Sequence, residues 1–173
     1  MNIESLCVNT HIKTDDIINA VLKNHSDMVY RLALSHLRNK ADAEDIFQDV
    51  FVKYIKSNKT FESNEHIKAW LIRVTLNCCN KFRKTAWFRH TVPLEDWSNE
   101  LTDESGHEKS EVYYAIQELP PKYRTVIHLF YYEDMPVAEI SSVLNMKQST
   151  VISQLSRARN ILKGKLKGDY ENE

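Results

Sequence analysis

The stretch VAEISSVLNMKQSTVISQLSRARNIL, residues 137–162, decides the fold of the C-terminal half of the chain. Ile140 and Leu144 lie four residues apart, which places them on one face of a helix. A second helix is predicted from apolar residues at spacings of four, three and four: Val151, Leu155, Ala158 and Leu162. Asn145 stands in the tight turn between the two helices, where a left-handed backbone is needed and asparagine is well tolerated. The pattern predicts a helix-turn-helix, whose second helix enters the DNA major groove.

The outward side of this second helix is suited to DNA. Short polar and amide side chains can reach base edges, and cations can contact phosphates. From Lys147 to Lys167 there are six cations and no acid, which favours DNA binding over the alternative of a helical hairpin with a solvated face. The residues predicted to contact DNA are Lys147, Gln148, Ser149, Thr150, Ser153, Gln154 and Arg157.

Composition favours an all-α fold. Three glycines and four prolines in 173 residues leave little turn chemistry for β-hairpins, and 42% hydrophobic residues are enough for a packed core. No apolar run approaches the roughly 20 residues that cross a bilayer, and residues 1–10 lack the basic start and apolar centre of a signal peptide. We therefore predict a cytoplasmic protein without membrane insertion.

The chain carries no pattern that predicts metal or enzyme chemistry. Its cysteines, Cys7, Cys78 and Cys79, include no CxxC pair, and none of the seven histidines completes a metal-site spacing. We interpret the cysteines as small buried hydrophobes, with a thiol switch as the alternative. Neither a nucleophile–base pair nor a phosphate-binding glycine loop is visible, so we predict a protein that is not an enzyme and needs no cofactor.

Apolar spacing is helical through residues 14–55. Acids in the stretch TDD, residues 14–16, predict a helix start because they favour the positive end of the helix dipole. A break is predicted at residues 39–40, with Asp42 capping the next helix at Ala43.

Turn residues and composition predict the rest of the order. Pro120-Pro121 interrupts one helical pattern. Residues 86–110 lack helical periodicity. The charge count over residues 85–110 is six acids and two bases. We predict a loop at 57–65 and a helix at 66–85. A linker follows at 86–110, which includes Trp87, Phe88, Leu94 and Trp97. After it we predict helices at 111–119 and 123–132, and a turn at 133–136 before the helix-turn-helix. Five cations and no acid from Lys68 to Lys84 mark a second basic zone, which suggests two nucleic-acid contacts joined by an acidic spacer.

Residues 119–163, LPPKYRTVIHLFYYEDMPVAEISSVLNMKQSTVISQLSRARNILK, resemble region 4 of extracytoplasmic-function (ECF) sigma factors. The resemblance implies that this segment reads the promoter −35 element through the DNA contacts named above. It also implies contact with the flap of RNA polymerase, which we expect at an apolar face near Leu129 and Phe130.

The N-terminal half strengthens this resemblance. Residues 41–51, ADAEDIFQDVF, are similar to region 2.2 of the same family, which docks on the polymerase clamp. The resemblance implies core-polymerase contacts by Asp45, Gln48 and Asp49. The alternative for this acidic stripe is simple helix capping.

Residues 66–84, HIKAWLIRVTLNCCNKFRK, resemble regions 2.3 and 2.4, which open and read the −10 element. Such a site needs aromatic rings that stack on unpaired bases and cations that follow the backbone. We predict Trp70 as a core residue, and Ser63, Asn64 and Glu65 as parts of a base-selecting loop. The resemblance implies −10 contacts by Phe61, Ser63, Asn64, Arg73, Asn77, Lys81, Arg83 and Lys84.

Together these segments predict two helical domains: region 2 at 14–85 and region 4 at 111–167, joined by the acidic linker at 86–110. The expected function is that of a sigma factor, with core RNA polymerase, promoter DNA and an anti-sigma factor as partners. One alternative is a stand-alone helix-turn-helix regulator, which would bind an operator without polymerase. Another is a helical adaptor or thiol sensor built around Cys78 and Cys79, without DNA affinity.

Overall fold

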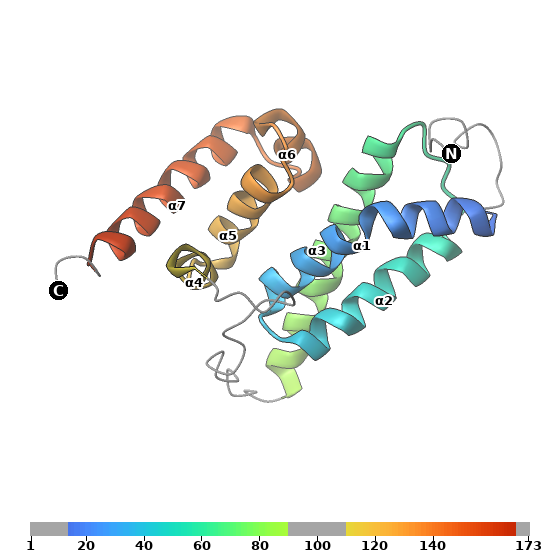
Figure 1. The fold of residues 1–173 in the computed structure, drawn as a ribbon, viewed down its shortest axis with the longest axis horizontal. Helices are drawn as coiled ribbons and strands as arrows, with labels where there is room; N and C mark the ends of the chain where they lie inside the picture. The colour runs from blue at the N-terminus through green and yellow to red at the C-terminus, as the bar shows by residue number, and fades with distance from the viewer. Residues whose placement is uncertain (1–13, 90–109, 169–173) are drawn as a thin grey trace. The chain divides into compact units, whose positions relative to one another are not determined.

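Every regular element in residues 14–89 and 110–168, the part of the chain that the computed structural model describes, is helical (Figure 1). The chain divides into two compact units, residues 1–88 and 89–173. The predicted all-α class is therefore confirmed. The predicted linker falls largely on residues 90–109, which lie outside the described residues, as does Cys7.

In the described residues of the first unit there are three helices: α1 (Asp15–Leu37), α2 (Lys40–Lys56) and α3 (Asn64–Arg89). α1 packs along α2, and all three helices contribute apolar side chains to one core. Burying each large apolar side chain contributes about 1.5–3 kcal/mol, so this core holds the unit together. Its most deeply buried members include Val21, Val29, Leu32, Val50, Tyr54, Ile67, Leu71 and Ile72.

The junction between α1 and α2 is built differently from the prediction. α1 starts at Asp15 with acids in its first turn, as predicted, and ends at Arg38 in a left-handed conformation with φ of 61°. The N-cap of α2 is Asn39, whose side-chain oxygen accepts a hydrogen bond from the Asp42 backbone N–H at 2.9 Å. The prediction that Asp42 caps a helix at Ala43 is therefore wrong. The Asn39 side-chain oxygen caps the helix by accepting from the otherwise unpaired Asp42 backbone N–H, and the helix begins at Lys40.

α3 is longer than predicted at both ends. It begins at Asn64, where Ser63 Oγ accepts from the His66 backbone N–H at 3.2 Å, and it continues to Arg89. Asn64 and Glu65 are therefore helical, and their placement in a loop was wrong. The Asn64 side-chain oxygen lies 2.8 Å from Nε2 of the buried His25, so the start of α3 is tied to α1.

The described part of the second unit, residues 110–168, contains α4 (Glu111–Gln117), α5 (Pro121–Ile127), the π-helix η3 (His128–Tyr132), α6 (Val137–Leu144) and α7 (Gln148–Gly168). α7 packs against α4, α5 and α6. The core between these helices contains Leu119, Val126, Ile127, Leu129, Ile140, Val151 and Ala158, each at most 1% exposed. The helix predicted at 123–132 begins two residues earlier, because Pro121 suits the first position of a helix, and its last turn is a wide π-turn.

The turn between α6 and α7 matches the prediction from Asn145. This residue ends α6 with φ of 53° and ψ of 50°, the left-handed conformation. The Met146 backbone N–H donates to the Ser141 carbonyl at 3.0 Å, and the Asn145 N–H donates to Ser142 at 3.3 Å. These bonds satisfy carbonyls that the end of α6 would leave open, so the helix-turn-helix is confirmed in its backbone.

Among the described residues, no helix combines the length and apolar character that crossing a membrane would require.

Candidate nucleic-acid and protein interfaces

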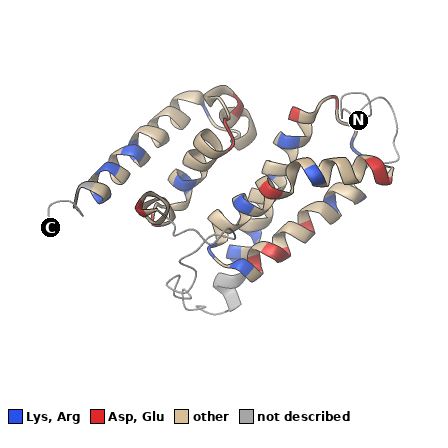
Figure 2. Ribbon diagram, in the orientation of Figure 1, with Lys and Arg blue, Asp and Glu red and all other residues tan. Residues whose placement is uncertain are grey.

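The predicted polymerase-binding stripe lies on the exposed side of α2. Figure 2 marks several acids along this helix, together with lysines. Asp45 and Gln48 are exposed, while the neighbouring Ile46 and Val50 point into the core. Asp49 is also exposed, but its carboxylate forms an ion pair with Lys53 one turn along the helix and accepts a weak hydrogen bond from the Cys78 thiol at 3.5 Å. The stripe therefore contains two exposed polar side chains and one carboxylate that is already engaged between α2 and α3.

The ion pair gives a pH-dependent prediction for Asp49. The hydrogen bond from Lys53 holds the pKa of the Asp49 carboxyl below its ordinary value of 3.8, with smaller contributions from Cys78 and Lys81. Its ionised form stabilises the fold above the ordinary pKa, and this stabilisation is lost as the pH falls through the lowered pKa. A carboxyl-detected NMR titration should show the pKa of Asp49 rising towards 3.8 in a Lys53→Met variant. A Cys78→Ala variant should give a smaller rise, and an unchanged pKa in both variants would contradict the assignment.

The predicted −10 surface is an exposed cationic face on α3. Arg73, Asn77 and Lys81 are exposed, as are Arg83 and Lys84 at the following turn. Their side chains are accessible for phosphate and base contacts.

An aromatic cluster lies beside this face. Phe61 is half-buried, and its ring meets those of Trp70 at 5.7 Å and Tyr54 at 5.9 Å. Trp70 is half-buried as well and meets Tyr54 edge-on at 6.0 Å. Trp70 thus belongs to the rim of the core rather than to its interior, and its ring packs edge-on against the Phe61 ring.

The predicted −35 surface is only partly assembled as expected. Lys147, Gln148, Ser149 and Thr150 are exposed at the start of α7, as are Ser153 and Arg157. The prediction that Gln154 lies on the outward side of this helix needs correction. Gln154 is half-buried, and its side-chain oxygen lies inside the unit because its position on α7 turns it towards the core. One other is engaged internally, since Ser153 donates to the Ser149 carbonyl at 2.8 Å. The neighbouring Arg157 guanidinium lowers the pKa of the Tyr123 phenol.

The exposed residues of this surface that sequence reasoning missed include an apolar one. Ile152 is 56% exposed on α7, between Val151 in the core and Ser153. The sequence pattern predicts only polar and charged side chains as DNA contacts. The signal that could have found Ile152 is its place outside the four–three–four spacing of the apolar core residues.

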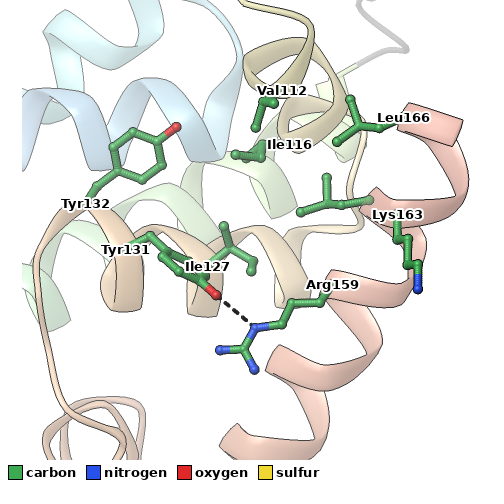
Figure 3. A pocket seen from close by; sticks show the side chains of 9 residues that line it. Val112, Ile116, Ile127, Tyr131, Tyr132, Arg159, Lys163 and Leu166 are labelled. Atoms are coloured by element: carbon green, nitrogen blue, oxygen red, sulfur yellow. Dashed lines mark hydrogen bonds between the residues drawn. The ribbon is translucent and has the colours of Figure 1, made fainter. Parts of the chain in front are cut away.

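A mostly apolar pocket of about 600 Å³ opens between α4, α5, η3 and α7 (Figure 3). On one side, Arg159 Nε donates to the Tyr131 phenol at 2.9 Å, and its guanidinium lies 5.6 Å from the ring centres of Tyr131 and Phe130. Partial burial raises the pKa of the Tyr132 phenol at the same pocket. The lining residues are Val112, Ile116, Ile127, Tyr131, Tyr132, Arg159, Leu162, Lys163 and Leu166.

The apolar surface lies beside the predicted position near Leu129 and Phe130, and other side chains form it. Leu129 is fully buried, so it belongs to the core and cannot meet a partner, while Phe130 is half-buried. The π-turn explains the difference, because it leaves Tyr131 and Tyr132 about half exposed at the surface in place of Leu129.

Cys78 and Cys79 are both buried. Burial raises the pKa of the Cys79 thiol to about 12 and also raises that of Cys78. Thiols react as thiolates, so these values argue against a thiol sensor at this pair.

Comparison with known proteins decides the family. A family model for Sigma-70 region 2 matches residues 21–89, and one for Sigma-70 region 4 matches residues 109–162. The ECF RNA polymerase sigma factor SigW of Bacillus subtilis is 30% identical over 159 residues, which cover 83% of this chain and 85% of that protein. The chain belongs to the ECF sigma factor family. Another similar relative of this sigma factor is the RNA polymerase sigma factor SigV of Bacillus subtilis, 29% identical over 87% of this chain and 91% of SigV.

Solved structures share the fold of this sigma factor. RpoE in complex with the anti-sigma factor NepR from Bartonella quintana gives a TM-score of 0.72 at 23% identity, covering 86% of this chain and 96% of that one. CnrH in complex with the cytosolic domain of CnrY gives 0.69 at 21% identity, covering 96% of both chains.

The family settles the predicted class of function. The chain is a sigma factor, a transcription-initiation protein and not an enzyme, and a stand-alone helix-turn-helix regulator is not favoured. The roles of individual residues remain predictions.

Proposed function

We propose that this ECF sigma factor binds core RNA polymerase through the exposed side of α2. Asp45 and Gln48 supply the principal contacts, and Asp49 contributes charge from within its pair with Lys53. The observation that carries the proposal is the exposure of these polar side chains on a helix whose other face is committed to the core. An exposed carboxylate that caps no helix end is available for a cationic partner.

Promoter contacts follow from the other exposed faces. The region 2 function resides in residues 14–85, where the cations of α3 and Asn77 lie on the −10 surface and Phe61 stacks on an unpaired base. Stacking on one base is worth about 1–3 kcal/mol, comparable with the cost of unpairing it. The predicted linker is shortened by α3, which extends to Arg89, so residues 90–110 act as the linker. Residues 111–167 place the start of α7 in the major groove of the −35 element.

The pocket beside α4 and α7 is the proposed contact for the polymerase flap. Its apolar lining suits an apolar segment of a protein partner, and Arg159 and Lys163 suit an acidic side chain on the flank of that segment. We further propose control by an anti-sigma factor, as in the complexes of RpoE and CnrH, and a cytoplasmic location, where polymerase and promoters are found.

Reconstitution tests the proposal. The purified chain is added to core polymerase on a library of promoter fragments, and transcripts are sequenced from their 5′ ends. We expect the chain to co-elute with core polymerase and to generate start sites that depend on it. If the folded chain, free of any anti-sigma factor, failed to co-elute, the proposal would be overturned, and operator binding without polymerase would then point to a stand-alone regulator.

A further inference from the structure

Ile152 is the most exposed of the large apolar side chains at the described surface, at 56%. It is the fifth residue of α7, in the part of the recognition helix that faces base edges when such a helix enters the major groove. Ser149 precedes it by three positions and Ser156 follows it by four, so the three side chains share one stripe of the helix.

Exposure by itself would mean little, because single apolar residues are common on protein surfaces. The surroundings of Ile152 make it different. Ser153 donates its hydroxyl to the helix backbone, and Gln154 has its side-chain oxygen inside the unit. Two of the side chains expected to read bases directionally are thus engaged, whereas Ile152 remains exposed between them and the start of the helix.

The chemistry of the major groove limits what an isoleucine can recognise there. Base edges in this groove are hydrogen-bond donors and acceptors, and the apolar group among them is the C5-methyl of thymine. An isoleucine at a base edge gains free energy against that methyl group. Against a polar edge it removes water from a donor or acceptor without replacing the hydrogen bond.

We infer that Ile152 contacts the C5-methyl group of a thymine in the −35 element and makes this sigma factor prefer a T·A pair at that position. The inference rests on the proposed function, in which the start of α7 enters the major groove. Burying one methyl group contributes enough free energy for about a fourfold preference for thymine over a base that lacks this methyl group.

The test uses holoenzyme assembled from core polymerase and the full chain. Promoter fragments with a randomised −35 segment are selected by wild-type and Ile152→Ala holoenzymes, and each preferred thymine is then replaced by deoxyuridine, which lacks only the methyl group. We expect one thymine whose replacement weakens wild-type binding about fourfold and leaves the Ile152→Ala holoenzyme unaffected. Alanine is the best helix former, so the variant keeps its helix.

Two further variants sharpen the result. Ile152→Val, which keeps a branched apolar side chain, should retain most of the sensitivity to deoxyuridine. Ile55→Ala removes a 46% exposed isoleucine from the other unit and should leave the base preferences unchanged. If the Ile152→Ala holoenzyme selected the same −35 sequences with the same deoxyuridine penalties, the inference would be overturned while the proposed function stood. If wild-type holoenzyme enriched no −35 sequence, the placement of α7 itself would fail.

Discussion

Replacing Asp45 by lysine is expected to weaken binding of this sigma factor to core RNA polymerase by about 100-fold or more. Losing one partner of a charge pair that becomes buried in an interface costs about 2–5 kcal/mol, and reversing the charge adds repulsion to that loss. Asp45 is exposed on α2, so the change should leave the fold of the free protein intact. Equilibrium binding of labelled chain to core polymerase, at several salt concentrations, measures the effect.

Two variants separate contact from general charge. Asp27→Lys makes the same charge change at an exposed position on α1 and should bind core polymerase within about twofold of wild type. Asp49→Lys also loses the internal pair with Lys53, so its loss of affinity should be accompanied by reduced stability of the first unit. Equal affinity losses in Asp27→Lys and Asp45→Lys would show that net charge, and not the α2 surface, governs binding.

Replacing Leu129 by alanine is expected to destabilise the second unit by about 2–5 kcal/mol, the usual cost of removing a fully buried leucine side chain. Leu129 is 0% exposed where the π-turn meets the core. Hydrogen–deuterium exchange on the full chain resolves the two units, so faster exchange should be confined to α4 to α7. The stability of α1 to α3 serves as an internal reference.

The matched variant is Tyr132→Ala, at the pocket surface. Tyr132 is 46% exposed, so its truncation should change stability by only about 1 kcal/mol while weakening binding of a polymerase flap fragment. A Leu129→Ala protein that kept its exchange protection but lost flap binding would show that Leu129 itself contacts the flap, against its burial in the core.

The features that could be predicted from sequence depend on neighbouring residues. The start of α1, the left-handed turn at Asn145 and the core face of α7 follow from capping preferences and helical spacing, which are local properties. The candidate contacts Asp45 and Gln48 came from the family resemblance, and the structure adds that both are exposed.

The failures have physical causes beyond the local sequence. Whether Asn39 or Asp42 caps α2 depends on the residue at which α1 ends, and packing of α1 determines that residue. Leu129 stands in an apolar run, and only the wide turn of η3 decides which residues of that run face inward. Gln154 lies at the edge of the buried stripe of α7, where a small rotation of the helix separates a base-reading side chain from an interior one.

α7 itself has a mechanical consequence. Its 21 residues form a rod about 30 Å long, with the candidate base-reading side chains in its first turns and Arg159, Leu162 and Leu166 of the pocket towards its other end. In the proposed function, a protein bound at the pocket holds α7 by its C-terminal half and thereby fixes the orientation of its first turns. In the proposed function, affinity for the −35 element would then depend on a protein contact located several helical turns from the nearest base.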